Sequence, residues 1–513
     1  MTSNTDSAMT LDLLDHTLRR DPHRPALLGA GRDGAPRVLA RRGEIADLAD
    51  AYAASLHARH GLRGGDTLGV AVRPGPRALA VMLAAHRLGL RAAVLDPSAG
   101  PDVLSARLAL APPALVLADA AAQAVAGWAA PLARRAHLAL PPLGMLGAAV
   151  ATVGPRRFGC APALDLSAPA RVPVPAAAPA GDGDAVIVFT SGTTAAPRAV
   201  VHSRASLAAG MSAVADLVCP QPGTTVLGGT FFVLVPALAA GARVALPART
   251  SQRLNRQIAR LRPDETYLTP PQVRTVRHFT GRVWTGSAPA SAQLLGRIRA
   301  AGASEAWSVY ALTELFPAAA VEYAEKAAFT DVGDLVGRPL PGVRARLADT
   351  GELLLTGPGA RDRYLGEAPD PWIRTGDRAT FAADGSIVLA GRCKDMVLRQ
   401  AENIYPGLYE PSLHLPEVES ALLVGIPAGG RDGDGDGDGD GDERLVALIQ
   451  PREGADRGKL RADLEVPLAR MGRARPDAVV FGDVPLAGRS RKPDRQEAAR
   501  LCARLCARGP SRR

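Results

Sequence analysis

A hydroxyl-rich loop near the middle of the chain carries the groups that bind phosphate. The apolar residues 185–189 predict a buried strand, which runs into four hydroxyl side chains around one glycine: Thr190, Ser191, Gly192, Thr193 and Thr194. Backbone N–H groups and short O–H donors in such a loop can close around the anionic oxygens of a polyphosphate. The segment lacks the Gly-Lys-Ser/Thr of a P-loop, and a plain turn between two strands is the alternative interpretation.

A second segment ends a predicted strand in small residues. Residues 283–289 read Val-Trp-Thr-Gly-Ser-Ala-Pro, so Gly286, Ser287 and Ala288 stand at the carboxyl end of the strand. Small side chains allow a flat ring to approach the backbone there, and open α/β sheets bind their ligands at this edge. A tight turn from strand to helix is the alternative interpretation.

A third segment, residues 307–314, combines an aromatic ring, a hydroxyl and a carboxylate. The ring of Tyr310 can pack on a base, Thr313 can donate to a phosphate oxygen, and Glu314 offers Mg²⁺ a hard ligand. Taken alone, a Thr-Glu pair more often begins a helix. Further along, Asp377 follows a strand and a glycine, where one carboxylate can accept hydrogen bonds from both hydroxyls of a ribose.

The elements that must position these residues alternate between strand and helix. In the N-terminal part, apolar strands and helices with apolar faces follow one another at residues 67–72, 77–88, 91–95, 103–110 and 114–117. This alternation predicts an α/β fold with layered sheets. The length of 513 residues is enough for two to four domains.

The overall composition excludes several classes of protein. The net charge of +10 comes mainly from scattered arginines, and aromatic residues make up only 4% of the chain, so we expect no nucleic-acid partner. The sequence shows neither a signal pattern nor an apolar stretch of membrane-spanning length, which predicts a cytoplasmic protein without membrane insertion. Five cysteines without a framework spacing predict reduced thiols.

Six strings of this sequence, in the same order, resemble motifs of the AMP-forming adenylating enzymes, a superfamily that includes acyl-CoA synthetases, peptide-synthetase adenylation domains and luciferases. The hydroxyl-rich loop is similar to their phosphate loop, aromatic-Thr-Ser-Gly-Ser/Thr-Thr-Gly-x-Pro-Lys-Gly-Val. Ala195 and Ala199 replace glycines of that pattern, and Arg198 replaces its lysine. The other strings are residues 286–289, 310–314, 372–378, 391–395 and 489–495.

This resemblance implies a role for each matching residue. The residues Gly286, Ser287, Ala288 and Tyr310 would lie against adenine. Thr313 would contact the α-phosphate, and Glu314 would help to hold Mg²⁺.

The remaining matches imply contacts with the ribose, the phosphates and the transition state. Asp377 would bind the ribose, and Arg392 would reach the ribose or a phosphate. Arg198 would keep a positive charge near the leaving phosphates. Lys492, one of only four lysines in the chain, would be the catalytic lysine. Arginine cannot replace a compact ammonium at every site, which singles out this lysine.

The resemblance also implies how the chain is divided. A large N-terminal domain of layered α/β sheets would span residues 1–390, a hinge residues 391–395, and a small mobile α+β domain residues 396–513. Within the small domain, the Asp-Gly repeat at 431–443 matches a calcium-loop pattern, but a strand follows it instead of an exit helix. We therefore interpret it as a flexible insertion.

The implied reaction is the conversion of a small-molecule carboxylic acid and ATP to acyl-AMP and pyrophosphate, followed by transfer to a thiol of coenzyme A or a carrier protein. Two alternatives stay open. Ala401 in the acceptor channel and the lack of a histidine at 231–236 resemble the olefin β-lactone synthetases, which close a β-hydroxy acid without a thiol. The substituted glycines at Ala195, Ala199 and Ala311 would also suit a non-catalytic relative that only binds nucleotide.

Overall fold

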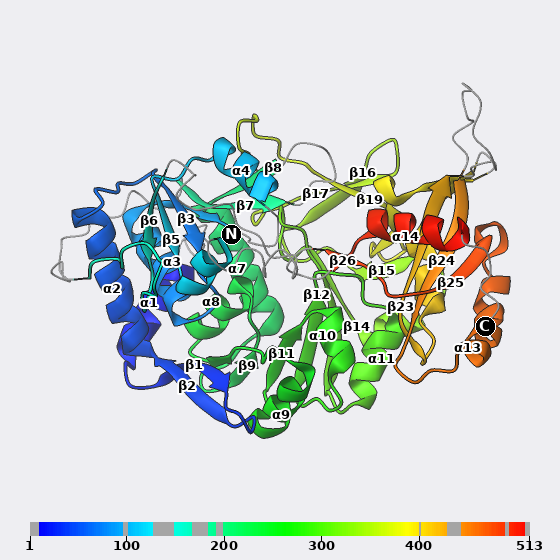
Figure 1. Cartoon of the computed structure of the whole chain (residues 1–513), viewed down its shortest axis with the longest axis horizontal. Helices are drawn as coiled ribbons and strands as arrows, with labels where there is room; N and C mark the ends of the chain where they lie inside the picture. The colour runs from blue at the N-terminus through cyan, green and yellow to red at the C-terminus, as the bar shows by residue number, and fades with distance from the viewer. Residues whose placement is uncertain are drawn as a thin grey trace.

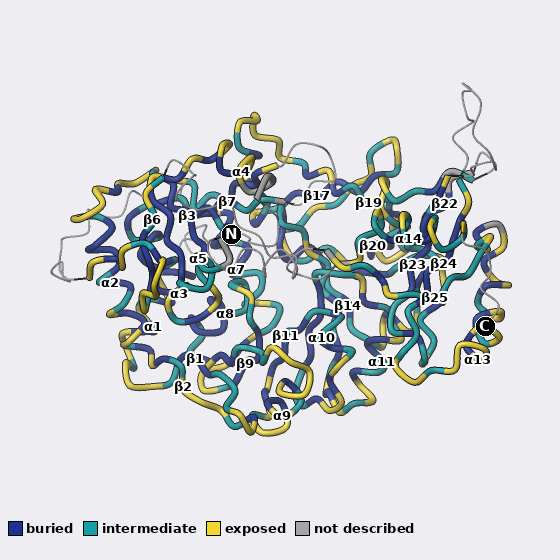
Figure 2. Tube along the Cα trace, viewed as in Figure 1, coloured by how far each residue is buried: buried dark blue, intermediate teal, exposed yellow. Residues whose placement is uncertain are grey.

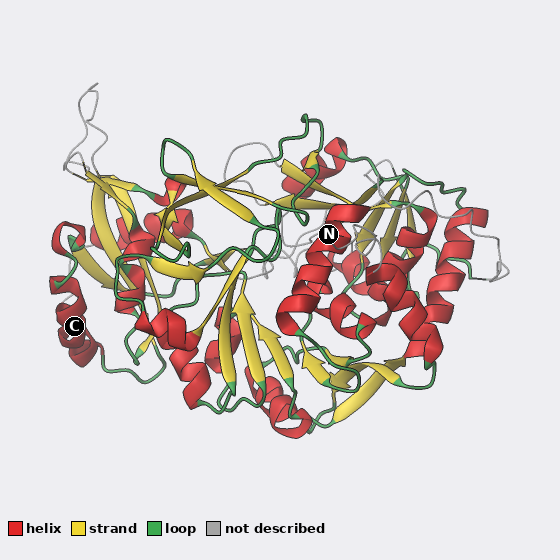
Figure 3. Ribbon diagram, turned by 180° about the vertical axis from the view of Figure 1, so that it is seen from behind, coloured by secondary structure: helices red, strands yellow, loops and turns green. Residues whose placement is uncertain are grey.

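The computed structural model describes residues 10–95, 101–126, 148–166, 183–190, 198–399, 402–427, 443–487 and 492–507. Within these residues, elements up to Arg392 form three sheets with flanking helices (Figure 1). The C-terminal elements gather at one end of the molecule, which both Figure 1 and the reverse view in Figure 3 show. The predicted layered α/β fold is confirmed.

The strands on either side of the hydroxyl-rich loop belong to a seven-stranded sheet with the order β18-β8-β7-β4-β3-β5-β6. Its strands are β3 (Thr67–Ala71), β4 (Arg91–Val94), β5 (Leu115–Ala118), β6 (Ala149–Thr152), β7 (Asp184–Thr190), β8 (Arg198–Ser203) and β18 (Arg363–Tyr364). Strands β3 to β7 run parallel, whereas β8 is antiparallel to both of its neighbours. Every residue of β3 is buried, as expected for a parallel strand covered on both faces.

An eight-stranded sheet carries the second and third segments, with the order β14-β13-β12-β11-β9-β10-β1-β2. Its strands are β1 (Pro25–Ala30), β2 (Pro36–Arg41), β9 (Thr225–Leu227), β10 (Arg243–Ala245), β11 (Glu265–Leu268), β12 (Arg282–Gly286), β13 (Glu305–Tyr310) and β14 (Ala319–Glu322). The inner strands are parallel, so the carboxyl ends of β12 and β13 lie side by side. This register brings Gly286 next to Val309, one residue before Tyr310.

Helices cover both sheets and close the core between them. They are α1 (Thr10–Arg20), α2 (Arg42–Ala58), α3 (Pro76–Leu88), α4 (Pro101–Leu110), α5 (Ala120–Ala126), α7 (Arg204–Val218), α8 (Phe231–Ala239), α9 (Ser251–Leu261), α10 (Pro270–Thr275), α11 (Ala292–Ala300) and α12 (Tyr323–Ala328). The largest buried cluster joins α1, α2, α3, α7 and α8 with strands of both sheets. Figure 2 shows buried backbone in dark blue along these sheets and helices. Helix α7 begins where the Ser203 hydroxyl accepts the N–H of Ser206, a regular N-cap.

A five-stranded antiparallel sheet has the order β15-β20-β19-β17-β16. Its strands are β15 (Asp334–Gly337), β16 (Arg344–Leu347), β17 (Glu352–Thr356), β19 (Ile373–Phe381) and β20 (Ile387–Arg392). A turn at Asp384 and Gly385 joins β19 to β20, and the pairing of these strands places Asp377 opposite Arg392. Its core cluster includes Leu315, Ala318 and Ala319, so this sheet packs against the segment that follows Glu314.

In its described residues, the C-terminal part contains three small sheets, two helices and four 3₁₀ turns. Its elements are η3 (Cys393–Asp395), β21 (Val397–Arg399), β22 (Glu402–Ile404), η4 (Pro406–Leu408), η5 (Glu410–Leu413), β23 (Val418–Pro427), β24 (Glu443–Pro451), α13 (Arg457–Ala469), η6 (Gly472–Ala474), β25 (Ala478–Phe481), β26 (Leu486–Ala487), β27 (Lys492–Pro493) and α14 (Arg495–Ala507). Two buried clusters draw only on residues after Asp395. The Asp-Gly repeat, apart from Glu443, lies outside the described residues.

Two further expectations concern cysteines and membranes. All five cysteines lie in the described part of the chain, and none of them forms a disulfide. Among the helices that the structure describes, none combines the length and the apolar character needed to cross a bilayer.

Candidate active site

The predicted phosphate loop connects two antiparallel strands. Thr190 at the end of β7 pairs with Arg198 at the start of β8. The predicted contacts of Ser191, Gly192, Thr193 and Thr194, and the substitution at Ala195, lie outside the described residues. Ala199 is buried in regular strand and has no positive φ, so the alanine that replaces the family's glycine causes no backbone strain.

Tyr310, Asp377 and Arg392 meet in one hydrogen-bonded corner, although 67 residues separate the tyrosine from the aspartate. The Tyr310 hydroxyl donates to Oδ2 of Asp377 over 2.6 Å, and Nε of Arg392 donates to Oδ1 over 2.9 Å. Burial, and next the charge of Asp377, raise the pKa of Tyr310 well above its usual value, so the phenol keeps its proton. The corner therefore offers a carboxylate, a ring and a guanidinium to one ligand.

Backbone and side-chain bonds hold the turn that carries Asp377. The hydroxyl of Thr375 accepts the N–H of Asp377 over 3.0 Å and donates to the carbonyl of Leu353 over 2.8 Å. Gly376 has a φ of 70°, which favours glycine, and its N–H donates to Glu352 over 3.0 Å. Sequence reasoning missed Glu352 as a support of the site, because only the sheet brings it to residue 376.

Thr313 and Glu314 lie in a tight turn, and no helix starts there, so the helix N-cap interpretation is wrong. The N–H groups of Leu312 and Leu315 each donate to the carbonyl of the other, over 2.9 and 3.3 Å. Ala311, at a position where the superfamily has glycine, does not have a positive φ. Both Thr313 and Glu314 are half-buried, so a ligand can reach their side chains.

The Glu314 carboxylate is held by a tyrosine that sequence reasoning missed. The hydroxyl of Tyr364 donates to Oε1 of Glu314 over 3.0 Å. The guanidinium carbons of Arg198 and Arg361 lie 4.6 and 4.4 Å from the centre of the Tyr364 ring. Arg198 also pairs with Glu367 at 3.6 Å. The basic residue after the phosphate loop and the candidate metal ligand therefore contact the same side chain.

Glu314 alone could hold Mg²⁺ only together with oxygens of the substrate and water. No group of three or more His, Cys, Asp or Glu side chains able to hold a metal occurs within the described residues. Mg²⁺ is commonly held by one or two carboxylates together with substrate phosphates and water. Tyr364 is the only described side chain that donates to the Glu314 carboxylate, which leaves oxygen lone pairs for such an ion.

The segment Gly286–Ala288 stands at the carboxyl end of β12, as predicted, but packing alone already requires its glycine. A Cβ on Gly286 would lie 2.9 Å from the carbonyl oxygen of Val309. Ser287 adopts a φ of 69°, unusual for a residue other than glycine, and its hydroxyl lies 3.1 Å from that of Tyr267. Tyr267 is a further residue that sequence reasoning missed.

The structure describes the backbone of Lys492 in β27, opposite Ala487 of β26, whereas its side chain and residues 488–491 lie outside the described part. Three residues later, Arg495 joins separate segments. Its Nε lies 3.0 Å from Asp395, and its two terminal nitrogens each lie 2.7 Å from an oxygen of Glu410. The segment that carries Lys492 is thus tied to residues 391–395.

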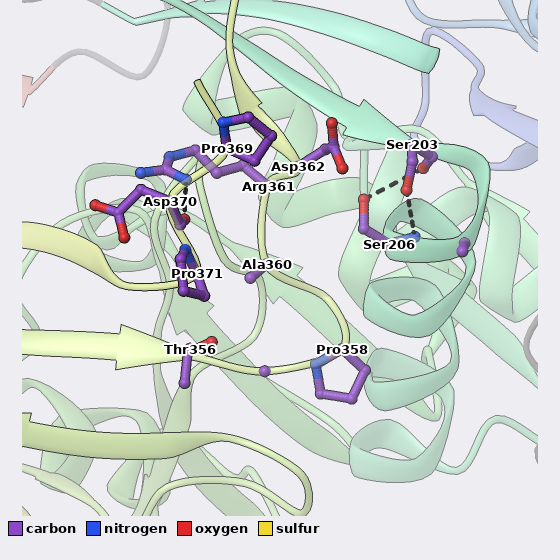
Figure 4. Close-up of a pocket in the computed structure, with 12 residues that line it drawn as sticks. Ser203, Ser206, Thr356, Pro358, Ala360, Arg361, Asp362, Pro369, Asp370 and Pro371 are labelled. Atoms are coloured by element: carbon purple, nitrogen blue, oxygen red, sulfur yellow. Dashed lines mark hydrogen bonds between the residues drawn. The ribbon is translucent and has the colours of Figure 1, made fainter. Parts of the chain in front are cut away.

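A surface pocket of about 380 Å³ lies between the start of helix α7 and the segment around Arg361 and Asp370. Figure 4 shows Ser203 and Ser206 on one side of it and Arg361 and Asp370 on the other. Arg361 donates to the backbone oxygen of Asp370 over 2.8 Å. We assign no ligand to this pocket.

Comparisons with known proteins agree with these motifs. The sequence profile of the AMP-binding enzyme family matches residues 14–366. An indoleacetate–CoA ligase of Aromatoleum aromaticum is 28% identical over 61% of this chain and 67% of its own length. An acyl-CoA ligase of Ajellomyces capsulatus is 27% identical over 47% of this chain and 48% of its own length. The chain spans about half the length of several of these curated relatives, and two thirds of the indoleacetate–CoA ligase.

Among solved structures, the amide bond synthetase McbA of Marinactinospora thermotolerans is similar in fold. The match has a TM-score of 0.73 and 23% sequence identity, and it covers 96% of this chain and 99% of McbA. At this identity the match shows the fold alone.

Proposed function

The chain belongs to the AMP-binding enzyme family, and on that premise we propose that it activates a carboxylic acid with ATP as an acyl-AMP, releasing pyrophosphate. One observation carries the proposal. Tyr310 and Glu314 stand at the two ends of one short segment. Tyr310 is hydrogen-bonded to Asp377, and Glu314 is hydrogen-bonded to Tyr364. A nucleoside bound at the first end would extend its phosphates toward the second.

The chemistry requires that two anions meet. A carboxylate is a weak nucleophile that the phosphates repel, so the site must align both and neutralise charge on the α-phosphate and the leaving group. We assign the ribose to Asp377, the α-phosphate to Thr313 and Lys492, and the leaving phosphates to Arg198 and the loop after Thr190. Mg²⁺ on Glu314 would add positive charge to the phosphate oxygens.

The second half-reaction is proposed to transfer the acyl group to a thiol. The relatives named above are CoA ligases, which supports coenzyme A as the acceptor. We propose that residues 391–395 are a hinge between an adenylating domain, residues 1–390, and a small mobile domain, residues 396–513. Ala401, which motivated the β-lactone alternative, lies outside the described residues.

The non-catalytic alternative loses part of its basis. Ala199 and Ala311, two of the three alanines that replace glycines, have no positive φ and so cause no strain. We therefore favour an active enzyme.

Pyrophosphate release from ATP and Mg²⁺ across a panel of fatty, aryl, amino and β-hydroxy acids tests this function. We expect one acid class to be required and coenzyme A to be consumed with it. Release without any need for a thiol, together with a β-lactone product, would favour the alternative reaction. Bound ATP with no release for any acid, with or without coenzyme A, would contradict the proposal.

Arg198→Ala is expected to lower kcat/KM for ATP about 10-fold, because charge-assisted hydrogen bonds to phosphate contribute about 1.5–3 kcal/mol and this side chain is half exposed. Arg198→Lys should retain most of the activity, since the superfamily pattern has lysine at this position. The matched control is Glu367→Gln, which removes the ion-pair partner of Arg198 and leaves its charge. Pyrophosphate–ATP exchange measures all three variants, and an unchanged KM for ATP in Arg198→Ala would refute the assignment.

A further inference from the structure

His202 is a buried histidine of β8, four residues after the start of the strand that follows the phosphate loop. Its side chain is 1% exposed, and Nε2 lies 2.8 Å from the carbonyl oxygen of Thr313, 111 residues away in sequence. A carbonyl oxygen only accepts, so Nε2 carries the hydrogen of this bond. Nδ1 then faces the Ser206 hydroxyl at 3.4 Å as the acceptor. Burial lowers the pKa of His202, which keeps the ring neutral.

Within the described residues, the bond from His202 holds the one carbonyl of the turn that accepts no backbone N–H. The carbonyl of Glu314 accepts the N–H of Arg361 over 2.6 Å, that of Leu312 accepts the N–H of Leu315, and that of Leu315 accepts the N–H of Leu312. Of the described residues, only His202 donates to the carbonyl of Thr313. The peptide plane between Thr313 and Glu314 therefore depends on this side chain. A rotation of that plane would redirect both the Thr313 hydroxyl and the Glu314 carboxylate.

The buried imidazole packs against Phe316, which is itself held by Phe232 and by helix α7. The edge of the Phe316 ring meets His202 with the ring centres 5.5 Å apart and the planes at 70°. Phe232 packs on the other side of this contact, 3.9 Å from the centre of the Phe316 ring. A Cβ on Gly210 of α7 would lie 2.8 Å from Phe316, so the helix is in direct contact with this ring.

We propose that His202 is a positioning residue that sets Thr313 and Glu314 for Mg²⁺-bound ATP and couples the strand after the phosphate loop to the metal-binding turn. The inference rests on the proposed function, because it assumes that the turn faces the phosphates. We expect substitution of His202 to affect one property of ATP binding and to spare another. Loss of His202 reduces the gain in ATP affinity that Mg²⁺ confers. It leaves the corner of Asp377, Tyr310 and Arg392 intact.

Two amide variants test the position of the donor. The amide nitrogen of glutamine in His202→Gln reaches the place of Nε2, whereas that of asparagine in His202→Asn reaches only the place of Nδ1. Removing a residue that orients a metal ligand typically costs about 10–100-fold in metal affinity or activity. We expect that loss in kcat/KM for Mg²⁺-ATP for His202→Asn and His202→Ala, and a loss of less than about 5-fold for His202→Gln. Ser206→Ala removes the hydroxyl that contacts Nδ1 and the carbonyl of Ser203, and leaves the bond from Nε2 to Thr313 in place. It is the matched control and should stay within about 2-fold.

The decisive readout is ATP binding by calorimetry, with and without Mg²⁺, because it needs no acid substrate. We expect His202→Asn to keep the metal-free affinity within about 2-fold and to lose most of the gain that Mg²⁺ confers. An equal loss with and without Mg²⁺ would show a merely structural role and overturn the proposal, as would His202→Gln behaving like His202→Asn. If the wild type releases no pyrophosphate with any acid, the proposed function fails, and the calorimetric comparison still decides the role of His202.

Discussion

Lys492→Ala is expected to lower the rate of adenylate formation by about 10²–10³-fold, the usual cost of removing one preorganised donor to developing charge. The ammonium would neutralise charge on the α-phosphate as the carboxylate attacks. Lys492→Arg should recover little of the rate, because a planar guanidinium does not replace a compact ammonium at a crowded phosphate. Acid-dependent pyrophosphate–ATP exchange at saturating ATP measures the effect.

The matched control is Lys459→Ala. Lys459 is one of the three other lysines, and it lies exposed on α13, where it pairs with Asp463 at 2.7 Å. Its loss removes the same charge from the C-terminal part and should leave the rate within about 2-fold. Near-wild-type exchange by Lys492→Ala would refute the catalytic assignment. A transfer step slowed as much as adenylation would point to misfolding of the C-terminal part instead, which thermal melting would reveal.

The order of strands and helices could be predicted from sequence because each element is a local pattern. The alternation at residues 67–117 became β3, α3, β4, α4 and β5, with every bound within two residues of the expected one. The proximity of Asp377 and Arg392 also has a local cause, since a hairpin turn at Asp384 folds one strand back onto the other. Local patterns in the sequence were therefore sufficient to predict the order of these strands and helices. The same kind of pattern accounts for the proximity of Asp377 and Arg392.

The supports of the candidate site could not be predicted, because each contacts a partner that lies far away in the sequence. Tyr364 reaches Glu314 over 50 residues, and His202 reaches Thr313 over 111. Neither residue stands in a pattern that marks it, since a tyrosine or histidine in an apolar strand is usually a core residue. Arg198 could be singled out from the sequence, because it stands where the superfamily's phosphate loop has lysine.

Asp377→Ala is expected to weaken ATP binding by about 10²-fold or more. If Asp377 accepts both ribose hydroxyls, two hydrogen bonds to a charged acceptor are lost, each contributing about 1.5–3 kcal/mol. The substitution also leaves the buried Tyr310 hydroxyl without its acceptor, which adds a cost of about 1–3 kcal/mol to folding. Calorimetry with ATP and thermal melting measure the two effects separately. Asp384→Ala, at the exposed turn of the same hairpin, is the matched control for the loss of one carboxylate.

A nucleotide lacking both hydroxyls separates direct recognition of the ribose from a general loss of structure. The wild type should bind 2′,3′-dideoxy-ATP about 10²-fold more weakly than ATP. In Asp377→Ala the two nucleotides should bind equally, because the group that distinguishes them is gone. Discrimination that persists in the variant would mean that another residue holds the ribose, and that the corner of Tyr310, Asp377 and Arg392 serves only to join β13 to the antiparallel sheet.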